Sequence, residues 1–470
     1  MFIWLTRLAR TLRDATRPLR RRAGLRTLSR SVGAAAALRL AAARRRRSQA
    51  TFVGVTGSSG KSTTVSLLSH ILAGSRAVHT QVFGNTIGDL PATLRGIPKE
   101  TDAVVAELGV TGFGTMRPMA ALLRPTVAIV TKVGLEHFKA FRSREAVAGE
   151  KGDLVEALPA NGLALLNADD AHVISMAQRT RARVVTFGWS EDADYRVLAA
   201  TAAFPDRLVV EVEAPAGRFE LETPFFGEHF WLATLAAFAA AVELGVDPAE
   251  AAARVATFTP PIDRCGVLAI AGGPTFVLDS VKAPSEGIAD AIAAVKKARA
   301  PAKRIVIGHI SDYAGSSHKP YRNAYDLARE AADRVVFVGE RAHRASASDE
   351  DRAAGRYTGF ATPREVAAHI RETTCPGELI FIKGSRNLHL ERIALDWTHD
   401  VRCWEAACGR SYDCIRCGLF EVPYEQHGEV RRAARRRRLW GRLFRFGRRD
   451  EQSAKPAGAG QAKDEPGKRR

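Results

Sequence analysis

The stretch FVGVTGSSGKSTTVSLLSHIL, residues 52–72, decides how the fold begins. A β-branched, apolar run enters a glycine-rich turn, and a lysine, hydroxyl residues and an amphipathic segment follow. Glycines let backbone N–H groups approach phosphates closely, and the helix that follows points its positive end at them. Lys61 would reach the β- and γ-phosphates, and the Ser62 hydroxyl would bind Mg²⁺. The stretch therefore predicts a nucleotide site between a strand and a helix.

This loop is a tighter variant of the common phosphate-binding pattern. That pattern has glycine where this chain has Val55. The combination Gly-Lys-Ser-Thr between a strand and a helix still favours nucleotide binding. The residues expected to contact the nucleotide from the loop are Thr56, Gly57, Ser58, Ser59, Gly60, Lys61, Ser62 and Thr63.

The positive charge of the 470-residue chain lies in two tails. The formal net charge is +19, yet residues 1–50 hold fourteen Arg against one Asp, and residues 430–470 hold fifteen Lys or Arg against four acids. Arg interleaved with Leu, Trp and Phe suits an anionic membrane surface, which is the partner we favour. Solubilising disordered tails have the same composition, and nucleic acid, the least favoured partner, attracts the same charge. The Arg-rich front also resembles an organellar transit peptide.

Nothing in the sequence predicts a membrane-spanning helix, because no run of about 18 apolar residues occurs. The apolar start MFIWL, residues 1–5, is too short for a secretory signal. We therefore expect the body of the chain in the cytoplasm, at the inner face of the membrane if the tails bind lipid.

Short apolar strands alternate with helical stretches along the body, which predicts an α/β fold with parallel sheets. Residues 204–222 differ, since they predict two antiparallel strands around the turn APAG. A second α/β unit, Rossmann-like, begins near Pro260 and carries the strands PTFVLDS, KRIVIGH, DRVVFVGE and ELIFIKGS. The predicted divisions are a basic amphipathic segment over 1–50, a central P-loop-type ATPase domain over 51–258, a C-terminal domain over 259–396, a Cys-rich module over 397–429, and a basic, largely disordered tail over 430–470.

The phosphate loop and several later stretches, in the right order, resemble the Mur ligase family of ATP-dependent amide-forming enzymes. The stretches of the D-alanyl-D-alanine-adding branch that match are GNTIGDLPATL (84–94), VVAELGVTGFGTM (104–116), IVTKVGLEHFKAFRSREAVAGEKGDLVEAL (129–158), LDSVKAPS (278–285) and IKGSRNLHLERI (382–393). The resemblance covers roughly residues 51–395.

The resemblance implies roles for particular residues. Glu107 and His137 would bind Mg²⁺ together with Ser62, and Lys151 stands where the family has a carbamylated lysine. Arg264 would contact the γ-phosphate and Asp279 would lie near the ATP. Each also has an ordinary structural interpretation: a surface acid, a structural histidine, a solvated lysine or a local ion pair.

Three departures limit what the resemblance implies. The family holds adenine with a Gly-x-His-Asn-x-x-Asn segment, and here Gly227 and His229 remain while Phe230 and Ala233 replace the amides. Lys282 stands in place of an asparagine. About fifty basic residues before the phosphate loop are not expected to form the family's domain that recognises a uridine nucleotide. This short basic lead-in resembles MurT, a relative that amidates a lipid-linked precursor.

A cysteine cluster follows the second unit. In a cytoplasmic chain, four clustered thiols favour structural Zn²⁺ over a redox or disulfide pair, although free thiols remain an alternative. His399 or His427 could replace one thiol, whereas Cys265 and Cys375 resemble core residues. The expected zinc ligands are Cys403, Cys408, Cys414 and Cys417.

Together these features predict a ligase that uses ATP and Mg²⁺ to activate a carboxylate as an acyl phosphate and join it to an amine, in cell-wall or envelope polymer synthesis. The substrates would be small or lipid-linked, and a partner subunit could supply ammonia. Two alternatives remain open: a P-loop NTPase or kinase, and a nucleotide-binding, membrane-associated scaffold or pseudo-ligase.

Overall fold

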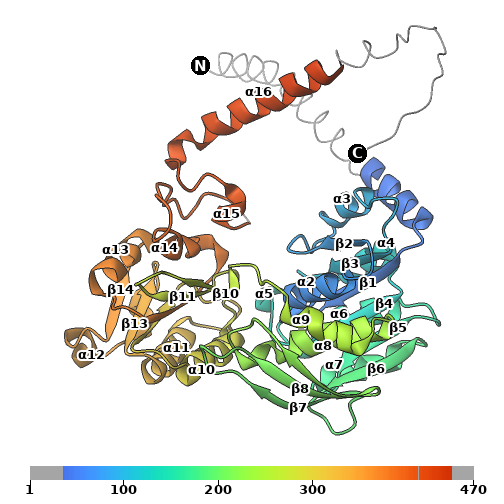
Figure 1. Ribbon diagram of the computed structural model, residues 1–470, viewed down its shortest axis with the longest axis horizontal. Helices are drawn as coiled ribbons and strands as arrows, with labels where there is room; N and C mark the ends of the chain where they lie inside the picture. Colours follow the sequence, from blue (N-terminus) through green and yellow to red (C-terminus); the bar gives the residue numbers. More distant parts are fainter. Residues whose placement is uncertain (1–34, 411, 447–470) are drawn as a thin grey trace, which may run out of the picture.

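The computed structural model describes residues 35–410 and 412–446. Strand β1, which begins the phosphate-loop stretch, lies inside a nine-stranded sheet (Figure 1). The strand order is β2-β3-β1-β4-β5-β6-β7-β8-β9; pairs up to β6–β7 are parallel, and β7, β8 and β9 are antiparallel. The predicted hairpin around APAG is thus confirmed as β8–β9. The strands are β1 (Thr51–Thr56), β2 (Val78–Gln81), β3 (Ala103–Glu107), β4 (Val127–Val130), β5 (Leu163–Asn167), β6 (Arg183–Gly188), β7 (Tyr195–Thr201), β8 (Val209–Ala214) and β9 (Gly217–Glu222).

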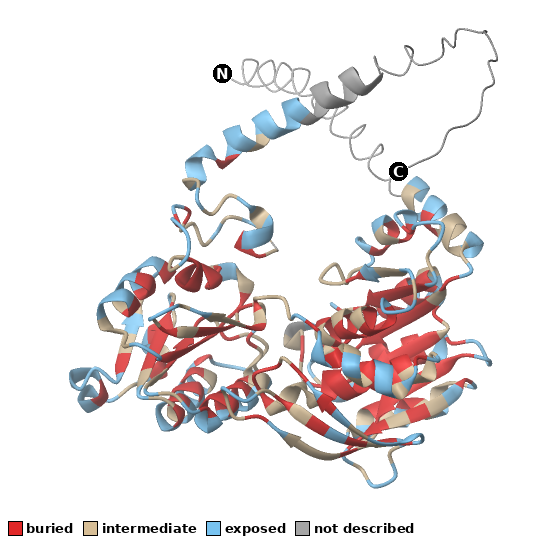
Figure 2. Ribbon diagram, viewed as in Figure 1, coloured by how far each residue is buried: buried red, intermediate tan, exposed pale blue. Residues whose placement is uncertain are grey.

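Helices cover both faces of this sheet, as parallel strands that are apolar on both sides require. One buried cluster includes Val53, Leu68 and Phe238, and a second, on the other face, includes Phe52, Met119 and Leu154 (Figure 2). The main helices here are α2 (Lys61–Leu72), α3 (Leu90–Arg95), α4 (Met116–Leu123), α5 (Phe138–Phe141), α6 (Arg144–Glu156), α7 (Ala171–Ile174), α8 (Trp231–Glu243) and α9 (Pro248–Ala256).

The second sheet has six strands in the order β10-β11-β15-β12-β13-β14, and all its pairs are parallel except β10–β11. The sequence predicted four of these strands and missed β10 and β14. The strands are β10 (Arg264–Ala269), β11 (Thr275–Asp279), β12 (Lys303–Ile307), β13 (Arg334–Val338), β14 (Tyr357–Phe360) and β15 (Leu379–Lys383), with helices α10 (Ile288–Lys297), α11 (His318–Ala331), α12 (Asp349–Ala353), α13 (Pro363–Thr373) and α14 (Glu391–Leu395).

The α/β prediction is confirmed, with two layered units beside each other (Figure 1). We propose that the two sheets mark the domains expected over 51–258 and 259–396.

Part of the basic N-terminal segment packs against the first unit. Residues 35–47 are helical, and Arg44 donates a hydrogen bond to the Ile97 carbonyl at 2.6 Å. Arg45 donates to the Leu123 carbonyl at 2.5 Å, and its guanidinium lies 3.6 Å from the centre of the Phe52 ring. These two arginines therefore help to hold the N-terminal helix against the first unit. Residues 1–34 of the predicted amphipathic segment lie outside the described residues.

At the other end, helix α16 (His427–Phe446) extends away from both sheets, and residues 428–437 are exposed except for the half-buried Arg431 (Figures 1 and 2). The prediction of a largely disordered tail is therefore wrong for residues 430–446, and residues 447–470 lie outside the described part. A run of Arg with Ala and Leu has good helix propensity, which composition alone did not weigh. None of the helices that the structure describes is long and apolar enough to cross a membrane.

The second unit contains a buried ion pair on which its stability is expected to depend. Arg304 and Glu378 are both fully buried and 2.8 Å apart, and Arg304 also donates to the Thr373 hydroxyl at 2.9 Å. Removing one partner leaves an uncompensated buried charge.

We expect Arg304→Ala to lower the free energy of unfolding by about 3–5 kcal/mol, because Glu378 would lose its buried counter-charge. Urea titration followed by circular dichroism measures this. The control is Lys296→Ala, which removes an exposed ion pair with Glu330 and should cost less than about 1 kcal/mol. Equal effects of the two substitutions would contradict the interpretation.

Candidate active site

The loop between β1 and α2 has the shape of a phosphate cradle. Gly57 has φ 146°, and a Cβ there would lie 1.9 Å from the Thr131 hydroxyl oxygen, so only glycine fits. Gly60 is left-handed at φ 78° and leads directly into α2. The Thr131 hydroxyl also donates to the Ser59 carbonyl at 2.6 Å, which ties the loop to the end of β4. The loop is thus held between two neighbouring strands at their carboxyl ends, where ligands bind in open α/β sheets.

Lys61, the first residue of α2, is buried. The region where it meets side chains of both units is called the cleft. The Lys61 ammonium donates to the Gly57 carbonyl at 2.5 Å and lies 3.9 Å from a Glu136 carboxylate oxygen. A lysine folded back on its own loop occupies the space that phosphate oxygens would take, so the arrangement fits a polyphosphate that draws the ammonium outward.

Ser62 and Glu107 meet as the sequence predicted. The Ser62 hydroxyl donates to Glu107 at 2.7 Å, and Glu107 also accepts from Asn85 at 2.8 Å and from the Phe83 backbone N–H at 3.2 Å. Although burial raises the pKa of Glu107, Lys61 and Arg264 hold it below its usual value. The carboxylate is thus ionised and next to a hydroxyl, a donor pair suited to Mg²⁺.

Lys151, on α6, is fully buried and forms an ion pair with Glu136. Burial lowers the pKa of Lys151 to about 8, against the opposing effect of Glu136. Burial alone would raise the pKa of Glu136, yet Lys61 and Lys151 hold it at about 2. Sequence analysis missed Glu136, although its position next to His137 in the matched stretch Leu-Glu-His could have drawn attention to it.

His137 is half-buried, and its backbone N–H donates to Asp312 of the second unit at 3.2 Å. Burial lowers the pKa of its imidazole, so a neutral ring is available as a ligand. Glu107, Glu136 and His137 do not converge on one point. Among the described residues, the group of His, Cys, Asp or Glu side chains with ligand atoms all within 4.8 Å of one another is instead His389, Glu391 and Cys414.

The second unit contributes cations to the same cleft. Arg264 donates to the Ser62 hydroxyl at 3.2 Å, across the junction between the two units. The pKa of Lys282 is lowered, first by Lys61 and then by burial, so the two ammonium groups are close. Asp279 forms an ion pair with Lys383 at the ends of β11 and β15, and makes no direct contact with the loop in any interaction that the structure shows.

The segment predicted to hold the base is apolar. The His229 ring lies against Phe230 in a tilted contact with ring centres 4.4 Å apart, and Phe230 stacks on Phe225 at 4.5 Å. Thr63 joins a cavity beside the loop that is lined by Ser62, Thr63, Ser66, Phe83, Phe225, Phe258, Pro260, Pro261 and Arg264. Aromatic and proline surfaces next to the loop fit a base held by stacking, as the loss of the two amides suggested.

The remaining predicted residues have structural partners. The Thr56 hydroxyl donates to the Leu108 carbonyl at 2.9 Å, and Ser58 accepts from the Gly134 N–H at 2.9 Å. Cys265 is buried as expected, whereas Cys375 is only half-buried, so it is not a core residue. The four clustered cysteines line one cavity.

The cleft thus gathers four cationic side chains, Lys61, Lys151, Lys282 and Arg264, around two carboxylates. A surplus of buried positive charge requires an anion, and ATP with Mg²⁺ fits both the loop and the Ser62–Glu107 pair.

Comparison with known proteins agrees with this geometry. Residues 55–241 match the Mur ligase middle domain. Over these residues the chain is therefore similar to Mur ligases. It is 33% identical over 218 residues to UDP-N-acetylmuramoyl-tripeptide–D-alanyl-D-alanine ligase of Mycobacterium tuberculosis, a match that covers 46% of this chain and 42% of that relative. The enzyme of the same name from Escherichia coli is 27% identical over 362 residues, covering 75% and 78% of the two chains.

Solved structures of a MurF enzyme and of a folylpolyglutamate synthase share the fold. MurF of Acinetobacter baumannii superposes with a TM-score of 0.70 at 24% identity and covers 77% of this chain and 80% of its own. The folylpolyglutamate synthase of Mycobacterium tuberculosis, solved with ADP and AMPPCP, gives a TM-score of 0.59 at 15% identity over 75% and 92% of the chains.

Gly57 offers a direct test of the phosphate loop. We expect Gly57→Ala to weaken ATP binding at least about tenfold, a loss of about 1.4 kcal/mol, because the new Cβ collides with Thr131 and reshapes the loop. Isothermal titration with MgATP measures this. The control is Gly112→Ala, where an added Cβ meets nothing within 4 Å. Unchanged affinity in Gly57→Ala would show that the loop does not hold the nucleotide.

Proposed function

We propose that this chain is an ATP- and Mg²⁺-dependent ligase that joins a carboxylate to an amine. The observation that carries the proposal is the buried ion pair between Lys151 and Glu136. The other carboxylate oxygen of Glu136 lies 3.9 Å from the ammonium nitrogen of Lys61 in the phosphate loop. A simple NTPase has no need of a second buried lysine with a lowered pKa beside its phosphate site.

In this reaction the substrate carboxylate attacks the γ-phosphorus of ATP, which gives an acyl phosphate and releases ADP. The amine nitrogen then attacks the acyl carbon and loses a proton, the amide bond forms, and phosphate leaves. Positioning and electrostatic stabilisation supply most of the catalysis in such a transfer. Bound Mg²⁺ would neutralise charge on the phosphate oxygens.

Each part of the site has a role in this proposal. Lys61 binds the phosphates, and Ser62 with Glu107 holds one Mg²⁺. His137 and a carbamate formed on Lys151 hold a second metal near the acyl phosphate. Arg264 brings a positive charge from the second unit to the γ-phosphate, while Asp279 positions Lys383 at the edge of the cleft.

Lys151 has the environment that carbamylation requires. Carbon dioxide reacts with an unprotonated amine, and burial lowers the pKa of this ammonium to about 8. The carbamate is an anion at the end of a long side chain, so it would replace Glu136 as a partner for nearby cations.

The substrates are proposed by class only. The relatives named above are ligases that add D-alanyl-D-alanine to a UDP-N-acetylmuramoyl-tripeptide, and the carboxylate of this chain's substrate belongs to a related wall or envelope precursor. The basic ends favour a precursor at a membrane surface, with the enzyme on the inner face and with ammonia or an amino acid as the amine, supplied by a partner subunit if ammonia is used.

The ligase reaction makes phosphate release depend on both substrates. We expect release from MgATP only when a pool of wall precursors and an amine are both present, and a fall of about 100-fold or more in Lys151→Ala. The control is Lys99→Ala, an exposed lysine between α3 and β3 that is not one of the proposed site residues, which should not change the rate.

Two outcomes would contradict the ligase proposal and favour one of the alternative functions. Turnover without an acceptor that survives Lys151→Ala would identify an NTPase. Tight ATP binding without turnover under every substrate combination, and with cell extract added to supply a partner, would identify a nucleotide-binding scaffold.

The carbamate can be detected separately. With ¹³C-bicarbonate, we expect a carbamate carbon signal that increases as pH rises from about 7 to about 9, because the unprotonated fraction of an amine with a pKa of about 8 increases over that range. The signal should be absent in Lys151→Ala. A signal of equal size in both proteins would come from other amines and would contradict the assignment.

A further inference from the structure

The cysteine module forms a closed cluster on the second unit, away from the phosphate loop. Its four cysteines, which come from residues 403–417, all line one cavity together with His389, which follows β15. All six cysteines of the chain are free thiols, so no disulfide joins them. Four thiols that line one space are typical of a metal site. Among the described residues, the ligand atoms within 4.8 Å of one another are those of His389, Glu391 and Cys414, so the other thiols would move closer to Cys414 when a metal binds.

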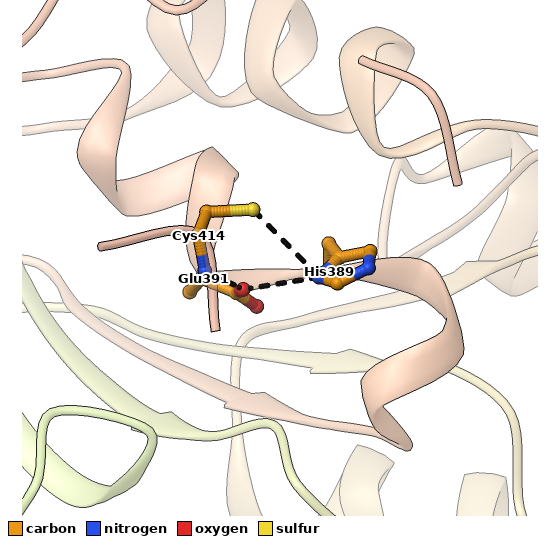
Figure 3. A group of neighbouring side chains, drawn as sticks. All are labelled: His389, Glu391 and Cys414. Carbon is orange, nitrogen blue, oxygen red and sulfur yellow. Dashed lines mark hydrogen bonds and ion pairs between the residues drawn. The ribbon is translucent and has the colours of Figure 1, made fainter. Parts of the chain in front are cut away.

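The contacts around His389 are close and buried (Figure 3). Its Nε2 lies 3.1 Å from the Cys408 sulfur, and its Nδ1 lies 3.7 Å from the Cys414 sulfur and 3.3 Å from a Glu391 carboxylate oxygen. The imidazole therefore links two thiols to a buried carboxylate. A carboxylate that orients a histidine beside thiolates is a common arrangement around zinc.

The expected substitutes His399 and His427 are engaged elsewhere. Nε2 of His427 is bonded to the Leu419 and Val422 carbonyls at 2.8 and 2.9 Å. Nδ1 of His399 lies 2.8 Å from the Thr398 hydroxyl.

Arginines contact the sulfur atoms. Arg392, which is 1% exposed, donates to the Cys414 sulfur at 3.0 Å and to the Glu405 carbonyl at 3.0 Å. Arg431 of α16 donates to the Cys417 sulfur at 3.7 Å. A buried guanidinium needs an anionic partner, and a neutral thiol is a poor acceptor. Metal-bound thiolates supply that negative charge.

The backbone of the C-x₂-C segment also has the geometry of a metal-binding turn. Helix α15 (Cys414–Cys417) is a single turn that is capped by Asp413, which accepts from the Arg416 N–H at 2.9 Å. It ends at Gly418, which is left-handed at φ 64°. The two pairs Cys-x₄-Cys and Cys-x₂-Cys fall within the usual ligand spacing for zinc.

We propose that this cluster is a structural zinc site whose ligands are the thiolates of Cys403, Cys408, Cys414 and Cys417. Four thiolates and Zn²⁺ carry two negative charges, which the two arginines balance. His389, which is 3.3 Å from Glu391, would donate a hydrogen bond to the Cys408 sulfur. The site is closed by four protein ligands, so it has no open position for catalysis.

The metal would fix a side chain in the active-site cleft. Arg416, between Cys414 and Cys417, places its guanidinium 4.5 Å from the centre of the Phe83 ring in the first unit. Phe83 lines the cavity beside the phosphate loop, and its N–H donates to Glu107. The zinc site thus connects the cysteine module to the cleft through one aromatic contact. This consequence rests on the proposed function, whereas the metal site itself does not.

Metal analysis of the untagged, full-length protein tests the site. We expect about one zinc per chain by plasma mass spectrometry, and release of that zinc when a mercurial reagent titrates the thiols. Cobalt substitution of the same protein should give an intense thiolate-to-cobalt charge-transfer band. No zinc, and no uptake after reduction and dialysis against Zn²⁺, would overturn the proposal whatever the protein's activity.

Variants identify the ligands. Cys414→Ser should lose the zinc, while Cys375→Ser, outside the cluster, and Arg416→Ala, whose side chain points to Phe83, should keep it. His389→Ala should also keep it, because the histidine is a neighbour and not a ligand; loss of zinc from this variant would overturn the four-thiolate assignment. Should Cys414→Ser fail to fold, the thiol count from the cobalt spectrum of the wild-type protein decides the ligand set.

Discussion

Mutual repulsion among buried cations is the constraint around which the cleft is organised. Lys61, Lys151 and Lys282 approach one another closely enough to lower the pKa of two of them, and Glu136 and Glu107 provide the nearby negative charge. Charges of one sign in a low-dielectric site cost free energy until a counter-ion arrives. A polyphosphate would offset that cost, so the arrangement of these side chains suits a highly charged anion.

The two sheets share this task unequally. The first carries the loop, and its rigid edge sets the positions of Gly57 and Thr131 through a contact that no larger residue permits. The second contributes side chains that reach across, such as Arg264 to Ser62 and Asp312 to the backbone of His137. Because these contacts join separate units, a change in their relative position would assemble or open the site, which is how many two-domain enzymes couple binding to chemistry.

Segments outside the two sheets lie at the periphery of the molecule, yet one of them contacts residues beside the phosphate loop. At the N-terminal side, Arg44 and Arg45 are used for packing against the first unit, so the basic composition of this segment is partly structural. At the C-terminal side, the cysteine module brings Arg416 to Phe83, where Arg264 and Arg386 also lie within 5.6 Å of the ring centre. Three guanidinium groups around one aromatic ring therefore add positive charge next to the phosphate loop.

The α/β class and the phosphate loop can be predicted from the sequence, because glycine spacing and apolar strand patterns are local properties of the chain. The pairing of Ser62 with Glu107, 45 residues apart, was expected only from the resemblance to a known family. The sequence also located the cysteine cluster, since ligand spacing is readable in one dimension. Only the tertiary structure decided the partners of Lys151 and of the sulfurs. Glu136 lies fifteen residues before Lys151, and His389 precedes Cys408 by nineteen, so neither pairing follows from spacing. Burial sets the charge state of such groups, and burial is a property of the packed molecule.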